Sequence, residues 1–90
     1  MNAPDAALIC RALSDTNRLQ IIQLLTNGEQ CTCDLLEHFS ITQPTLTHHI
    51  TILSECGLLR SRKEGRNTFY ALNCETLTDF RKFIAGLVCR

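Results

Sequence analysis

Several features that mark whole classes of protein are missing from this 90-residue chain. It has no apolar run approaching the ~20 residues of a transmembrane helix. Its start lacks the basic segment and apolar run of a signal peptide. We therefore expect no membrane span, no signal peptide and a cytoplasmic location. Internal repeats, linkers and low-complexity segments are also missing, which predicts a single domain over residues 1–90.

The chain also has no net charge, because its nine Lys and Arg residues balance nine Asp and Glu residues. A uniformly basic nucleic-acid-binding protein is therefore excluded. The charges are nevertheless uneven: residues 1–40 hold two arginines against five acidic residues, whereas residues 58–66 hold four basic residues against one glutamate. This local basic patch can contact phosphate groups while the remaining surface stays neutral.

The other elements of the chain are arranged around residues 41–57. Thr42 is a suitable helix N-cap, Pro44 fits the first turn, and Gly57 can end the helix in a left-handed conformation. Helical spacing predicts an inward apolar face formed by Leu46, Ile50, Ile52 and Leu53. The outward face carries the donors and acceptors that a helix needs to read DNA base edges: Gln43, Thr45, Thr47, His48 and His49. An ordinary amphipathic helix would show the same pattern, so the neighbouring segments must distinguish a DNA-reading helix from an ordinary surface helix.

Those neighbours predict a winged helix-turn-helix. Apolar periodicity indicates helices at residues 4–13, 18–26, 33–39 and 43–56, and a last helix that begins at Asn73 or Thr76. The short connection before residue 43 is typical of a helix-turn-helix. Alternation predicts strands at 58–62 and 67–72 with a basic tip at Gly65, although a solvated surface hairpin would look alike. The fold class is mainly α with a β-hairpin wing.

The first and last helices are too apolar to be freely exposed. Ala6, Leu8 and Ile9 belong to the first, and Leu77, Phe80, Ile84 and Leu87 form a stripe along the last. We expect these two helices to form a homodimer interface. The last helix can also pack within its own chain, and the two arrangements are compatible.

Motifs across residues 8–73 resemble the ArsR/SmtB family of bacterial metal-responsive winged-helix repressors. They are ALSD at 12–15, RL at 18–19, GEQCTCDL at 28–35, QPTLTHHI at 43–50, GLL at 57–59, RKEGR at 62–66 and Tyr70. The C-x-C-D-L element directly before the Q-P-T-x-x-H-H-I helix resembles the signature of the arsenic-responsive branch.

The resemblance implies a homodimer that binds double-stranded operator DNA and blocks transcription until a metalloid releases it. It places Cys31 and Cys33 at the inducer, trivalent arsenic or antimony, and implies no permanent cofactor. It places the following residues at the DNA: Gln43, Pro44, Thr45, Thr47, His48 and His49 on the reading helix, and Lys63 and Arg66 on the wing.

The spacing of Cys31 and Cys33 suggests how an inducer would act. Soft thiolates select thiophilic metals and metalloids, and trivalent arsenic binds up to three sulfurs in a pyramid. Residues two apart on a regular helix point ~200° apart. Both thiolates can hold one atom only if the helix start is distorted or the helix begins at Cys33. Binding would then strain the first turn of the helix that supports the reading helix.

A third sulfur ligand is not evident from the sequence. Many arsenic sensors of the family have a cysteine at the position of Leu36. The resemblance favours Cys10 instead, because the first helix of a related branch supplies a cysteine across the dimer. The remaining thiols are weaker candidates: Cys56, Cys74 and Cys89. The family's zinc sites use Asp and His on the last helix, and no histidine follows His49, so we expect no zinc site there.

Four other functions are compatible with parts of the sequence. The trigger of the repressor could be cadmium or lead bound by four thiolates, or thiol oxidation. A winged helix can also be a protein-binding module that has lost its DNA contacts. A thiol-transfer enzyme has little support, because the chain has no C-x-x-C motif, and Cys33, Asp34 and His38 share one short helix. We expect no enzymatic activity.

Overall fold

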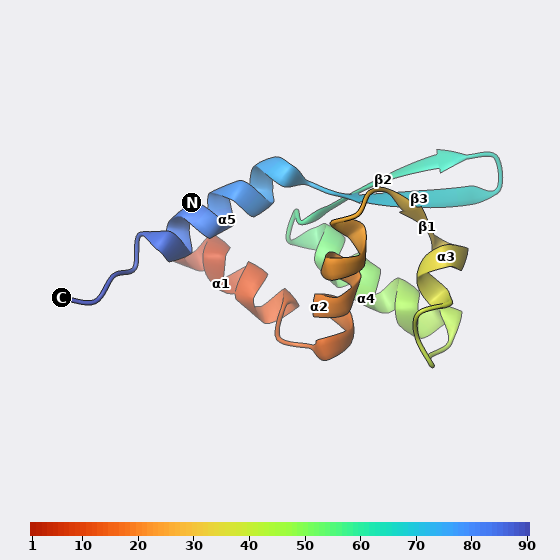
Figure 1. The fold of residues 1–90 in the computed structure, drawn as a ribbon, viewed down its shortest axis with the longest axis horizontal. Helices are drawn as coiled ribbons and strands as arrows, with labels where there is room; N and C mark the ends of the chain where they lie inside the picture. The colour runs from red at the N-terminus through yellow and green to blue at the C-terminus, as the bar shows by residue number, and fades with distance from the viewer.

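The computed structural model describes residues 1–90 without a gap. Its elements are, in order, α1 (Ala3–Ala12), α2 (Thr16–Leu25), β1 (Gln30–Cys31), α3 (Thr32–Leu36), α4 (Gln43–Glu55), β2 (Leu59–Glu64), β3 (Asn67–Leu72) and α5 (Cys74–Ala85). The strands form one antiparallel sheet in the order β1-β3-β2. Helices α3 and α4 form the helix-turn-helix and β2–β3 the wing, so the predicted winged helix-turn-helix is confirmed (Figure 1).

Strand β1 corrects the predicted element order, in which the only strands are those of the hairpin. Gln30 and Cys31 lie opposite Tyr70 and Phe69 of β3. A strand of two residues exists only because this distant partner pairs with it. It is too short to show the alternation of apolar and polar residues by which a strand is predicted. Helix α3 follows at once and ends at Leu36, earlier than the helix predicted over 33–39.

Polar side chains begin four of the helices. The residues whose side chains accept a hydrogen bond from a backbone N–H three residues later are Asn2, Asp15, Thr42 and Asn73. In α4 the Oγ1 atom of Thr42 accepts from the N–H of Thr45 at 3.3 Å, which confirms the predicted cap. Gly57 (φ +86°) follows the end of α4, and Gly65 (φ +63°) turns the wing, so both occupy backbone conformations that favour glycine.

One apolar core fixes the helix-turn-helix in place. Its members are Ile9, Ala12, Ile21, Leu25, Leu35, Leu46, Ile50, Leu53, Leu58 and Leu59. They come from α1 to α4 and from the segment that enters β2. The inward face predicted for α4 is therefore confirmed, with Ile52 only half-buried at its edge.

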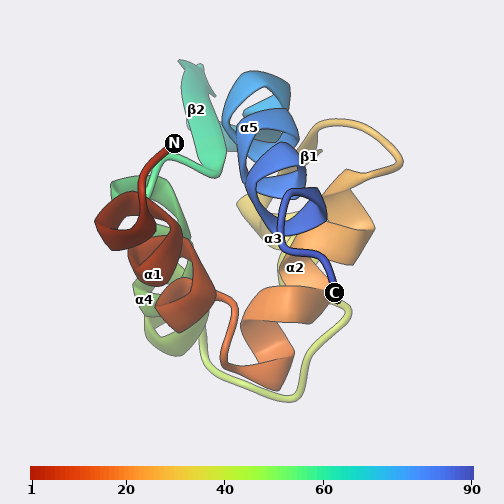
Figure 2. The same cartoon turned by 90° about the vertical axis from the view of Figure 1, so that its left-hand side faces the viewer.

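The molecule is elongated, with extents of 50 × 24 × 21 Å. One end holds α1 and α5, and the other holds α3, the start of α4 and the tip of the wing (Figure 1). Figure 2 looks onto the first end, with α1 and α5 both in front. The elements expected to touch DNA are thus separated from those expected to form a dimer.

Helix α5 divides into two parts. Leu77 and Phe80 pack against the core. Ile84 near the end of α5 is exposed, as is Leu8 on α1. Leu87 and Val88 are also exposed, but they lie beyond Ala85, where α5 ends, so the stripe predicted along the last helix stops at Ile84. This end of the molecule therefore presents an apolar surface that the chain itself leaves uncovered. None of the helices has the length and apolar character needed to cross a lipid bilayer.

Candidate nucleic-acid interface and cysteine pair

The outward face of α4 presents most of the side chains predicted to read DNA. The exposed ones are Gln43, Pro44, Thr45, Thr47 and His48. Thr42 fixes the first turn twice, because its hydroxyl accepts from the N–H of Thr45 and donates to Oγ1 of Thr45 at 3.0 Å. The first two turns of α4 therefore offer hydroxyl, amide and imidazole groups on a stable backbone.

The structure corrects the position of His49. Its side chain is buried on the inward face, and its Nδ1 atom lies 3.2 Å from Nη1 of Arg18 in α2. A guanidinium only donates, so Nδ1 accepts and the ring proton is on Nε2. The reason is periodicity, since residue 49 follows Leu46 by three positions and shares its face. His49 is a packing residue on the inward side of α4.

The free positive charges of the wing are fewer than the sequence indicates. Lys63 and Arg66 are exposed and have no ion pair. Arg60 lies 4.0 Å from a carboxylate oxygen of Glu75 and donates to Oδ1 of Asn73. Lys63 lies near the end of β2 and Arg66 in the turn of the hairpin, and both are free to meet phosphate groups, as predicted for a wing.

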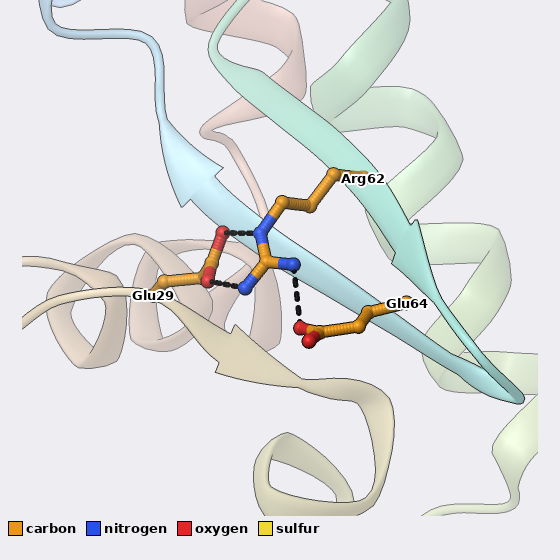
Figure 3. Close-up of polar contacts among 3 residues, drawn as sticks. All are labelled: Glu29, Arg62 and Glu64. Atoms are coloured by element: carbon orange, nitrogen blue, oxygen red, sulfur yellow. Dashed lines mark hydrogen bonds and ion pairs between the residues drawn. The ribbon is translucent and has the colours of Figure 1, made fainter.

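Arg62 is instead engaged by two carboxylates on the surface of the sheet (Figure 3). Its Nε and Nη2 atoms donate to the two oxygens of Glu29 at 2.9 and 2.6 Å, and Nη1 donates to Glu64 at 2.8 Å. The guanidinium also lies 4.6 Å from the centre of the Phe69 ring. Hydrogen bonding from Arg62 lowers the pKa of Glu29, and bonding to Glu29 raises the pKa of Arg62.

The two cysteines predicted to bind the inducer occupy different backbone environments. Cys31 is the last residue of β1 and the N-cap of α3, with extended backbone angles (φ −81°, ψ 165°). Cys33 is the second residue of α3 and is exposed. The 200° separation of a regular helix therefore does not apply to them, because Cys31 lies outside the helix. Helix α3 begins at Thr32, one residue before the predicted start.

No third ligand joins Cys31 and Cys33 within one chain, since no group of three His, Cys, Asp or Glu side chains is placed to hold a metal ion. Cys10 belongs to α1, at the opposite end of the molecule from α3 (Figure 1). Cys56 is half-buried, and burial raises the pKa of its thiol. Leu36, where the family's arsenic sensors often have cysteine, packs against the core.

Comparison with known proteins decides the family. A family model described as bacterial regulatory protein, arsR family, matches residues 15–61, which run from the cap of α2 into the wing. The chain belongs to the ArsR family. Members of the ArsR family are DNA-binding transcriptional regulators, not enzymes.

Individual ArsR-family relatives cover most of the chain. The arsenical resistance operon repressor of Staphylococcus aureus is 46% identical over 79 residues, 88% of this chain and 76% of the relative. A cadmium resistance regulatory protein CadC homolog of the same species is 36% identical over 75 residues, 82% of this chain and 62% of the relative. Among solved structures, a possible transcriptional regulator for arsenical resistance is 32% identical with a TM-score of 0.79, covering 84% of this chain and 79% of that one.

Proposed function

We propose that this ArsR-family chain is a transcriptional repressor that releases its operator when arsenite or antimonite binds Cys31 and Cys33. The observation that carries the proposal is the position of the two thiols, at the junction of β1 and α3, the helix that precedes the reading helix. The 46% identity to a protein named as an arsenical resistance operon repressor supports the same inducer.

On the DNA side, α4 enters the major groove with the exposed side of its first two turns. The reading residues are Gln43, Pro44, Thr45, Thr47 and His48, whose donors and acceptors suit base edges. Lys63 and Arg66 at the end of the wing contact backbone phosphates, which adds affinity without sequence preference.

The binding form is a homodimer joined through α1 and α5. The exposed apolar residues at that end are Leu8, Ile84, Leu87 and Val88. A second copy covers this surface and removes it from water. Two-fold symmetry then sets the two reading helices ~34–36 Å apart, one helical turn of DNA.

Inducer binding is a ligand exchange at trivalent arsenic. Each thiol replaces one hydroxyl of As(OH)₃ and releases one water, so arsenic keeps its oxidation state and two cysteines leave one hydroxyl bound. A third sulfur would complete the pyramid, and Cys10 of the partner subunit is the candidate that the family resemblance implies, since Cys10 is exposed. Strain at the start of α3 then displaces α4.

A cadmium-responsive repressor is the second candidate, supported by the 36% identity to the CadC homolog. Fluorescence anisotropy on the duplex upstream of this protein's gene, under reducing conditions, separates the candidates. We expect tight binding that arsenite reverses at a lower concentration than cadmium or zinc. Reversal by cadmium alone would replace arsenic as inducer, and absence of duplex binding would refute the repressor.

A further inference from the structure

Cys31 and two residues of the wing lie side by side across the three strands of the sheet. Cys31 of β1 lies opposite Phe69 of β3, and Phe69 lies opposite Arg62 of β2. Residues directly opposite one another in antiparallel strands project to the same face. The guanidinium of Arg62, 4.6 Å from the centre of the Phe69 ring, is therefore on the face to which Cys31 belongs.

Glu29 provides a second connection between the Cys31 segment and the wing. It lies two residues before Cys31 and holds Arg62 through two parallel hydrogen bonds of 2.9 and 2.6 Å. The side chain of Arg62 crosses β3 to reach it (Figure 3). The segment that carries Cys31 is thus joined to the wing both by backbone pairing with β3 and by this ion pair. A bidentate pair fixes orientation as well as distance.

We propose that Glu29 and Arg62 are positioning residues that transmit inducer binding at Cys31 to the wing. The inference rests on the proposed function, which makes Cys31 an inducer ligand. When one arsenic atom draws the sulfurs of Cys31 and Cys33 together, Cys31 leaves its position opposite Phe69. Glu29 moves with it, the bond to Arg62 breaks, and the hairpin changes its orientation. The inducer then acts on both DNA-contacting elements, on α4 through α3 and on the wing through β1.

The ion pair between Glu29 and Arg62 is exposed enough to break when the inducer binds. The side chains of Arg62 and Glu29 are 50% and 33% exposed. Exposed ion pairs contribute little to the free energy of folding, because water and salt compete with them. The pair can therefore open without unfolding the sheet. Strand β1 is also only two residues long, so little backbone pairing opposes its displacement.

Glu64 provides a matched control. Its carboxylate also accepts a hydrogen bond from Nη1 of Arg62, at 2.8 Å, but Glu64 belongs to β2 and moves with the wing. Glu29→Gln and Glu64→Gln each remove one carboxylate charge that pairs with the guanidinium of Arg62. Only Glu29→Gln weakens the connection to the segment that carries Cys31. A purely electrostatic role would make the two variants alike.

The test follows the backbone amide signals of Gly65 and Arg66, at the tip of the wing, by NMR on the DNA-free protein during arsenite titration. Arsenic–thiolate absorbance in the ultraviolet reports arsenite binding separately. In the native chain and in Glu64→Gln, we expect bound arsenite to shift both amide signals. In Glu29→Gln we expect arsenite to bind while the shifts fall to less than half, and the ratio of DNA affinities without and with arsenite to fall about fivefold.

Two results would overturn the coupling. The first is arsenite bound to the native chain with unmoved signals at the tip of the wing. The second is equal shifts in Glu29→Gln and Glu64→Gln. Either leaves the proposed repressor intact if arsenite still releases the duplex. Failure of the native chain to bind arsenite at all would instead refute the inducer assignment, and the coupling with it.

Discussion

The guanidinium of Arg18 joins the end of α1 to the buried face of the reading helix. Its Nη1 atom lies 3.2 Å from Nδ1 of His49, and its Nε atom donates to the carbonyl oxygen of Ala12 at 2.6 Å. Ala12 is the last residue of α1, and His49 is in the middle of α4. One side chain therefore fixes the distance between the helix expected at the dimer interface and the helix expected in the DNA groove.

Replacing Arg18 should destabilise the domain through the groups it leaves unpaired. Arg18→Met deprives the buried Nδ1 of His49 of its donor, and we expect the free energy of unfolding to fall by about 1–3 kcal/mol. His49→Leu should cost a similar amount. The double variant should lose less than the sum of the two, because neither partner remains unpaired. Urea denaturation followed by circular dichroism measures all three, and strictly additive losses would show that the pair does not interact.

The parts of the fold that follow from neighbouring residues could be predicted from the sequence. Thr42 and Gly57 mark the limits of α4, Gly65 marks the turn of the wing, and periodicity identifies Leu46 and Leu53 as core residues. Each of these features depends on backbone preference or on spacing within a few residues. The outward positions of the reading helix follow from the same periodicity.

The parts that depend on distant partners could not be predicted. Strand β1 forms against residues 69 and 70 of β3, almost forty positions later. Periodicity accounts for the inward position of His49, three residues after Leu46, but the partner of its ring, Arg18, lies 31 residues earlier and is not evident from spacing. Arg62 counts as a free charge in the sequence, yet it pairs with Glu29, 33 residues earlier. Charge counting gives no information about such pairing.

The cysteine pair should be required for release but not for DNA binding. Cys31→Ser and Cys33→Ser each keep the backbone and remove a thiolate, so we expect duplex affinity close to the native value and no release by arsenite. Cys89→Ser is the matched control, because Cys89 is exposed near the chain end, outside every helix and strand. Anisotropy titrations compare the three. Normal release in both Cys31→Ser and Cys33→Ser would remove the pair from the mechanism.

The end of the wing should contribute affinity that depends on salt rather than on sequence. Lys63→Ala and Arg66→Ala each remove one unpaired charge. We expect weaker binding to all duplexes, and a plot of log affinity against log salt flatter by about one unit per lost phosphate contact. Arg81→Ala, an equivalent change on α5, is the control and should leave the slope unaltered. A native slope in both wing variants would contradict the assignment.

Cys56 should be the least reactive of the thiols examined by alkylation. Its Sγ atom lies 3.3 Å from the carbonyl oxygen of Leu53, and burial raises the pKa of the thiol, so little thiolate is present at neutral pH. Iodoacetamide should label Cys56 more slowly than the exposed Cys33 and Cys74. Mass spectrometry of timed digests measures the order. Labelling of Cys56 at the rate of Cys33 would show that α4 opens far more often than a packed helix should.

Glu29 should stabilise the fold at neutral pH and lose that effect in acid. Its bonds to Arg62 lower the pKa of the carboxyl in the folded state below that of the unfolded chain. A lowered folded pKa gives stabilisation that is complete above the unfolded pKa and disappears as the pH falls through the folded one. The free energy of unfolding of the native chain should therefore exceed that of Glu29→Gln at pH 7, by a small amount because the pair is exposed. The difference should vanish once the pH falls below the lowered pKa of the folded state.

Urea titrations at several pH values measure this difference, with Glu37→Gln as the control. Glu37 is exposed and has no ion pair, so its replacement should change the free energy of unfolding little at any pH. The difference in the free energy of unfolding between the native chain and Glu29→Gln could instead stay constant from neutral pH into acid. Glu29 would then stabilise the fold through its shape and not through its charge. In that case Arg62 would be held by its contact with Phe69 rather than by the carboxylate.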